Sequence, residues 1–197
     1  MKNRGFVIWL IIVVIVVLFF LNYKSLLGLV QKNYSSPIVV QPTPTTVAIE
    51  DKEVHSLDGT MKVIMKSKKD ESGLTTYSFF TADISGKNEK YLFARTVGQG
   101  QSMVIPENSW SPDNSYLFLR ENKSDFFDIL VFKASGESFS DGKEYIDVLP
   151  LFDNNKIKYN IRDITGWDSP TLLHVYTEGP PYWFDVTTRS FIQLVRR

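Results

Sequence analysis

Short runs of alternating apolar and polar residues fill the chain from Leu57 onward. Side chains that recur at every second position place one face of a strand against a core, and the runs end at turn-forming Gly, Pro, Asn, Asp and Ser. No run has the spacing of a convincing amphipathic helix. The pattern predicts nine strands, at residues 61–66, 77–84, 90–96, 116–121, 126–133, 144–149, 172–177, 182–186 and 191–195.

A different pattern precedes them near the N-terminus. From Phe6 to Leu21 the chain has 16 consecutive apolar residues without a charge. Such a run spans about 24 Å as a helix, and its neighbours extend it toward the ~30 Å of a hydrocarbon core. We therefore expect residues 6–30 to be a transmembrane signal anchor, with the lipid bilayer as the partner of Phe6 to Leu21. Because Lys2 and Arg4 precede the run, residues 1–5 are expected in the cytoplasm and the rest of the chain outside it.

Two alternatives concern the same N-terminal run. A cleaved signal peptide has a shorter apolar region that ends in a small-x-small cleavage site, and Asn22 to Leu27 offer none. The segment from Lys2 to Phe6 resembles a type IV prepilin leader, which is cut between Gly and Phe. The glutamate of that family would fall on Leu10, so a pilin-like assembly subunit is the less favoured interpretation.

Proline and threonine mark residues 31–53 as a linker. The stretch from Gln41 to Thr46 favours extended polyproline II, because proline fixes φ and moves its neighbour out of the helical region. The remaining residues, 54–197, form the expected extracytoplasmic β domain.

Charge and composition argue against several classes of function. The 22 basic and 22 acidic residues balance, but residues 1–32 carry +4 and the remainder −4. A mildly acidic body does not favour nucleic-acid binding. The absence of Cys excludes disulfides and thiolate sites, and His55 and His174 alone do not predict a metal centre. We expect no cofactor and no bound metal.

Three stretches repeat one plan of turn, strand, loop and longer strand. They begin at Ser56, Ser109 and Gly166, and the second reads Ser-Trp-Ser-Pro-Asp-Asn-Ser-Tyr-Leu-Phe-Leu. Short strands at such a period are typical of a propeller-type array. The residues from Trp110 to Leu119 resemble the W-S-P-D-G repeat of TolB-like β-propellers, and the stretch from Phe127 to Gly136 is similar to that family's next strand and turn. In the third stretch, Asp168 precedes the Ser-Pro pair, whereas in that family's motif the aspartate follows it.

The resemblance implies an all-β fold of about three TolB-like blades, incomplete or open. In the chain these blades follow the one transmembrane helix that the apolar run predicts. The resemblance also implies structural roles for the motif residues: tight turns from Ser111, Pro112 and Asp113, and packing between sheets by Trp110. The degraded repeat places Trp167 and Asp168 at the equivalent positions. Closed propellers have four to eight blades, so exposed blade edges would remain, through which the chain could oligomerise.

No catalytic motif accompanies these repeats. Ser102, His174 and an Asp lack a spacing signature, and Gly98 to Ser102 lack the lysine of a phosphate loop. A cluster of aromatic residues, Tyr182, Trp183 and Phe184, is the candidate contact surface, although packing between blades is the favoured interpretation of it. We therefore expect a non-catalytic binding or scaffold module with a protein partner in the cell envelope. The alternative is a cell-envelope hydrolase or carbohydrate-active enzyme on a propeller-like scaffold.

Overall fold

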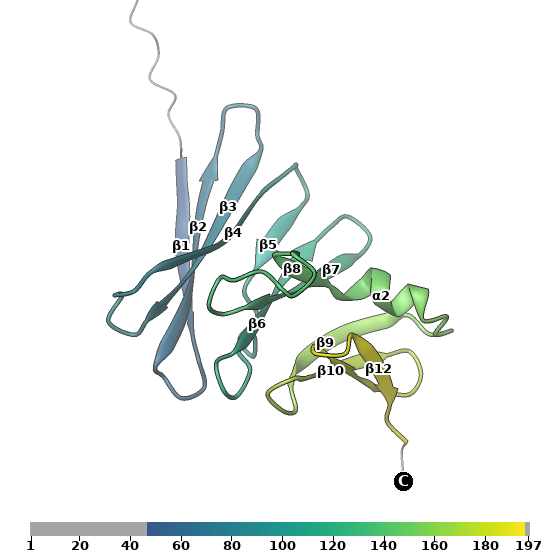
Figure 1. Ribbon diagram of the computed structural model, residues 1–197. Coiled ribbons are helices and arrows are strands. Elements are labelled where there is room, and N and C mark those ends of the chain that lie inside the picture. Colours follow the sequence, from purple (N-terminus) through teal and green to yellow (C-terminus); the bar gives the residue numbers. More distant parts are fainter. Residues whose placement is uncertain (1–46, 196–197) are drawn as a thin grey trace, which may run out of the picture. The chain divides into compact units, whose positions relative to one another are not determined.

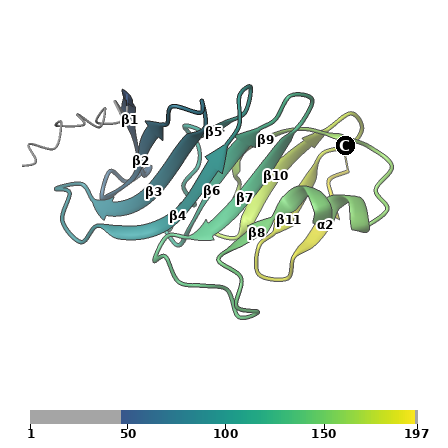
Figure 2. The same cartoon turned by 90° about the horizontal axis from the view of Figure 1, so that it is seen from above.

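The computed structural model describes residues 47–195, and these form an all-β structure with one short helix (Figures 1 and 2). Three antiparallel sheets of four strands each follow one another along the chain, with strand orders β1-β2-β3-β4, β5-β6-β7-β8 and β12-β11-β10-β9. Every strand pairs with its neighbour in sequence, so each sheet is a simple meander.

The first sheet holds β1 (Val47–His55), β2 (Met61–Lys69), β3 (Thr75–Asp83) and β4 (Lys90–Val97). The second holds β5 (Ser102–Val104), β6 (Tyr116–Asn122), β7 (Phe127–Lys133) and β8 (Tyr145–Asp147), and it continues into helix α2 (Val148–Asn154). The third holds β9 (Ile161–Trp167), β10 (Leu172–Thr177), β11 (Tyr182–Asp185) and β12 (Ser190–Gln193).

The same backbone hydrogen bond closes the turn before the second strand of every sheet. The amide of Ser56 donates to the carbonyl of Met61, that of Ser111 to Tyr116 and that of Asp168 to Leu172, each at 2.9 Å. Because these bonds coincide, Met61, Tyr116 and Leu172 occupy equivalent positions. The three sheets are therefore structural repeats of one another.

A second recurring bond lies beside the first, at the open end of each central hairpin, and fixes the register of its two strands there. The amide of Ile84 donates to Thr60, that of Ala134 to Ser115 and that of Val186 to Thr171, at 2.9–3.0 Å. This bond makes Ile84, Ala134 and Val186 equivalent as well. The two sets of bonds together allow any position in one sheet's central hairpin to be compared with its counterparts in the other two.

Two apolar cores separate the three sheets. The first packs β2, β3 and β4 against β5, β6 and β7; its largest fully buried side chains are Phe79, Trp110 and Phe132. The second packs the other face of β6 and β7, together with α2, against the third sheet, around Phe118, Phe152 and Phe184. The second sheet is therefore covered on both faces, as its continuous buried runs in β6 and β7 require.

The structure corrects the predicted elements in three places. Strand β1 takes in residues 47–53, which the sequence assigned to the linker, and it contains an irregularity between Ile49 and Lys52 that hides any alternation. Strands β5 and β9 were not predicted. The strand predicted at 144–149 ends at Asp147 and turns into helix α2, where Pro150 lies in the first turn and needs no intrahelical N–H partner.

The predicted signal anchor at residues 6–30 and the first part of the predicted linker lie outside the described residues. Within residues 47–195, no helix is long and apolar enough to cross a membrane.

Candidate functional site

The indole rings of Trp110 and Trp167 join consecutive sheets at equivalent points. Trp110 is only 2% exposed, and its Nε1 donates to the carbonyl of Val54 in the first sheet at 3.2 Å. Trp167 repeats this contact one sheet later, where its Nε1 donates to the carbonyl of Ser109 at 2.8 Å. Its ring also stacks on Tyr116, with centroids 6.1 Å apart. Both tryptophans therefore lie between sheets.

The motif residues between Ser111 and Ser115 build a self-contained turn. Ser111 Oγ donates to Asp113 at 2.8 Å, and Asp113 also accepts from the amide and the hydroxyl of Ser115. Burial pushes the pKa of Asp113 upward, but the hydrogen bonds from Ser115 and Ser111 outweigh it and hold the pKa below its usual value. Pro112 is exposed at the tip of this turn.

The same turn also contacts the first sheet. Asn114 Nδ2 donates to both carboxylate oxygens of Asp58, at 3.0 and 2.9 Å. These bonds, followed by those from Thr60 and Ser56, lower the pKa of Asp58. The carboxylates at this end of the sheets thus serve turn geometry and contacts between repeats.

The predicted contact surface of Tyr182, Trp183 and Phe184 is divided between two faces of β11. Tyr182 is 7% exposed and Phe184 fully buried, and both belong to the second core. Successive side chains of a strand point to opposite faces, so Trp183 alone of the three points away from this core. Tyr182 and Phe184 thus pack between sheets, the interpretation that the sequence favoured for this cluster, and of the candidate contact surface only Trp183 faces outward.

Trp183 belongs instead to a face that sequence inspection did not identify. His174, Trp183 and Ile192 lie side by side across β10, β11 and β12, and Tyr176 follows His174 on the same side of β10. Tyr176 is 46% exposed and Ile192 45%. We refer to these four residues as the outer aromatic face.

The equivalent face is covered in the two preceding sheets. Val63 and Phe118 correspond to His174 and are 0% and 1% exposed, whereas His174 is only partly buried. Thr81 and Val131 correspond to Trp183 and are also buried. The outer aromatic face is therefore equivalent to the surface that, in each of the two earlier sheets, is covered by the next sheet.

Local hydrogen bonds fix the two polar rings of the outer aromatic face. Trp183 Nε1 donates to Asp168 Oδ2 at 2.6 Å, and His174 Nδ1 shares a hydrogen bond with Thr165 Oγ1 at 2.9 Å. Asp168 thus positions a neighbouring aromatic side chain. Rings held in one orientation lose little conformational freedom when another molecule binds them.

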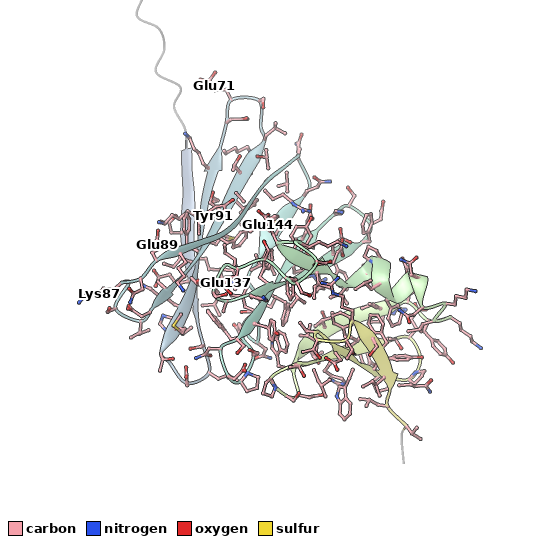
Figure 3. The ribbon with its side chains drawn as sticks, in the orientation of Figure 1. Glu71, Lys87, Glu89, Tyr91, Glu137 and Glu144 are labelled. Atoms are coloured by element: carbon pink, nitrogen blue, oxygen red, sulfur yellow. The ribbon has the colours of Figure 1, made fainter. Side chains whose placement is uncertain are left out.

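The outward face of the first sheet has the opposite character. Lys62 pairs with Glu53 at 2.9 Å, and Lys66 pairs with Glu89 at 3.3 Å while its ammonium lies 4.5 Å from the ring centroid of Phe80. Glu89 and Tyr91 mark this side of the sheet in Figure 3. Tyr91 is exposed on this side, but lysine stems and ion pairs surround Phe80, as on the terminal repeat of a solenoid.

A charged cluster lies at the far end of the interface between the first and second sheets. Arg95 pairs with Glu121 and donates to the Tyr145 hydroxyl at 2.9 Å, and Lys123 pairs with Asp128. Burial raises the pKa of the adjoining Asp147 to about 6, and the charge of Asp128 adds to the shift. The Oδ1 atom of Asp147 is buried without a hydrogen-bond partner.

The remaining candidates of the sequence do not converge. Ser102 accepts a hydrogen bond from Asn122, whereas His174 bonds to Thr165 in another sheet. In the part of the chain that the structure describes, no group of three or more His, Asp or Glu side chains could hold a metal ion.

Comparison of the chain with protein-family models, with curated proteins and with solved structures finds no match.

Proposed function

We propose that this protein is a membrane-anchored, extracytoplasmic binding module whose three sheets are TolB-like propeller blades. Its outer aromatic face binds a protein partner in the cell envelope, and the helix at residues 6–30 holds the body at the membrane. Support for the blades comes from the W-S-P-D turn at Trp110 and from the hydrogen bonds that recur in all three sheets.

One observation carries the binding role. The face that is buried under the next sheet in both earlier repeats stays accessible in the third, and it presents Tyr176, Trp183 and Ile192. Trp and Tyr are enriched among the residues that dominate binding energy at protein interfaces. By contrast, the ion pairs on the first sheet's outward face would lose their solvation if an apolar surface covered them.

Site-specific photo-crosslinking tests this function. A photoreactive phenylalanine analogue replaces Tyr176 in the full-length chain, and in a matched variant it replaces Tyr91, which is 57% exposed on the first sheet. We expect a discrete adduct from position 176 that disappears in the Trp183→Asp background, and none from position 91. Adducts of equal yield from both positions, or none from 176, would refute binding through this face.

Surface labelling in intact cells tests the proposed topology. Lys87 lies in the turn between β3 and β4 and is exposed (Figure 3). A membrane-impermeant amine reagent should modify Lys87 before lysis, and the chain should remain in carbonate-washed membranes. Labelling of Lys87 only after lysis would contradict an extracytoplasmic body.

A further inference from the structure

A cavity of about 440 Å³ lies between the second and third sheets, and its lining shares no residue with the outer aromatic face. It is bordered by the turn between β6 and β7, by helix α2 and by the beginning of β9. Cavities of this size accommodate small ligands or one large side chain of a partner.

The floor of this cavity is apolar and rigid. It consists of Phe127, Leu149, Phe152 and Ile161. Phe152 is 2% exposed within the second core, and the other three pack against that core. The floor is therefore part of the packed interior and is formed before any ligand arrives.

Three carboxylates, Asp125, Asp153 and Glu178, line the same cavity. Only Glu178 has a partner among the lining groups: Arg162 pairs with it at 2.8 Å, and Asn160 Nδ2 donates to it at 3.2 Å. In residues 47–195, the side chains of Asp125 and Asp153 have neither an ion pair nor a hydrogen bond. Three carboxylates against one guanidinium leave the lining with a net charge of −2.

Lys123, which lies beside the lining residue Phe126, is already engaged elsewhere. Lys123 lies 4.9 Å from the ring centroid of Phe126, but its ammonium pairs with Asp128 in the charged cluster. Phe126 borders the cavity and is 56% exposed, so its ring is available to a second cation. An apolar floor with uncompensated carboxylates above it selects a ligand with an apolar body and a positive head.

We propose that this cavity is a binding site for an organic cation, either an ammonium or a guanidinium group on an apolar stem. The charged head lies between Asp125 and Asp153, and the stem covers Leu149 and Ile161. The same chemistry is presented by a free small amine and by a lysine or arginine side chain of a peptide. The cavity shares no residue with the outer aromatic face, so this proposal does not rest on the proposed partner.

Titration of the full-length chain with defined probes, followed by calorimetry, tests the site. The probes are phenethylammonium, its neutral analogue 2-phenylethanol and the capped peptide acetyl-Ala-Arg-Ala-amide. We expect a cationic probe to bind at least about tenfold more tightly than the neutral analogue, because charged hydrogen bonds are stronger than neutral ones. A preference for phenethylammonium would identify the source as a free amine, and a preference for the peptide would identify a side chain; both support the site.

The Asp125→Asn/Asp153→Asn double variant supplies the structural test. Both side chains are exposed and unpaired, so the variant should melt like the wild type. Its affinity for the cationic probe should fall at least about tenfold, whereas Glu71→Gln, at the tip of the β2–β3 hairpin (Figure 3), should have no effect. Equal binding of the neutral and cationic probes, unchanged affinity in the double variant, or no binding of either cation at millimolar concentration would overturn the proposal.

Discussion

The contacts of the three tryptophans in the β body predict a graded loss of stability on truncation. Trp110 is almost fully buried between the first and second sheets, Trp167 is partly buried between the second and third, and Trp183 lies on the outer aromatic face. Replacing each by alanine removes the same chemical group from three environments. The free energy of unfolding should therefore fall most for Trp110 and least for Trp183.

The expected magnitudes follow from burial and hydrogen bonding. Trp110→Ala should cost about 3–5 kcal/mol, because it leaves a cavity and also removes the donor to the Val54 carbonyl. Trp167→Ala should cost about 2–3 kcal/mol, because its ring is stacked on Tyr116 but partly solvated. Trp183→Ala should cost about 1 kcal/mol, since it leaves no core cavity but removes the donor to Asp168.

Urea unfolding of the full-length chain, followed by far-ultraviolet circular dichroism, measures all three variants. A domain of ordinary stability has about 5–15 kcal/mol, so Trp110→Ala removes a large fraction of it. Trp110→Phe separates the hydrogen bond from the packing: it should cost about 1–2 kcal/mol, because most of the apolar surface remains. The reasoning fails if Trp110→Ala costs under about 1 kcal/mol, or if Trp183→Ala costs as much as Trp110→Ala.

Three further substitutions test individual contacts. Because the pKa of Asp147 is raised from 3.8 to about 6, the folded state binds the proton of this carboxyl more tightly than the unfolded state does. The stability that this proton contributes is lost as pH rises from 4 through 6. The Asp147→Asn variant should therefore be about 1–2 kcal/mol more stable than the wild type at pH 7.5, and its stability should not show this pH dependence in thermal melts from pH 4.5 to 8. Stability–pH curves of the variant and the wild type that run parallel would contradict this prediction. Gly166 has φ 137°, and a Cβ there would lie 3.0 Å from Asn108 Cβ, so Gly166→Ala should cost about 1–3 kcal/mol in the same urea assay. An unchanged free energy of unfolding would mean that residues 166 and 108 do not pack this closely. Asn114→Ala should raise the pKa of Asp58 toward its usual value in an NMR titration, and an unchanged pKa would show that the contact is not formed in solution.

The sequence was informative where one local pattern determined the structure. The Trp-Ser-Pro-Asp stretch predicted the turn before β6, since its hydrogen bonds involve residues within five positions of one another. Apolar alternation located most strands of the three sheets for the same reason. Strand β5 has only three residues, too few for a period, and α2 occupies a run whose apolar residues suit a buried strand equally well.

The candidate sites depended on relations between sheets, which a single run of residues does not contain. The cluster Tyr182-Trp183-Phe184 is uniformly aromatic, so hydrophobicity alone could not distinguish the buried face of β11 from the outer one. Strand alternation could have separated Trp183 from its neighbours, but only the packing identifies the core side. The cation cavity joins Asp125 to Glu178 across two sheets, and no spacing signal connects them.

Comparison of equivalent positions gives the strongest argument about which end of the sheet array meets a partner. Leu117 and Leu173 are buried against the preceding sheet, whereas their counterpart in the first sheet is Lys62, which pairs with Glu53. On that side the apolar residue of the repeat has been replaced by a charge, so stacking another sheet there would bury an ion pair at a net cost. At the other end, His174 and Trp183 replace Phe118 and Val131, and His174 Nδ1 and Trp183 Nε1 are already hydrogen-bonded, to Thr165 and to the Asp168 carboxylate. Covering the outer aromatic face therefore removes apolar surface from water while these two ring atoms keep their hydrogen-bond partners, which favours that end as the one that binds.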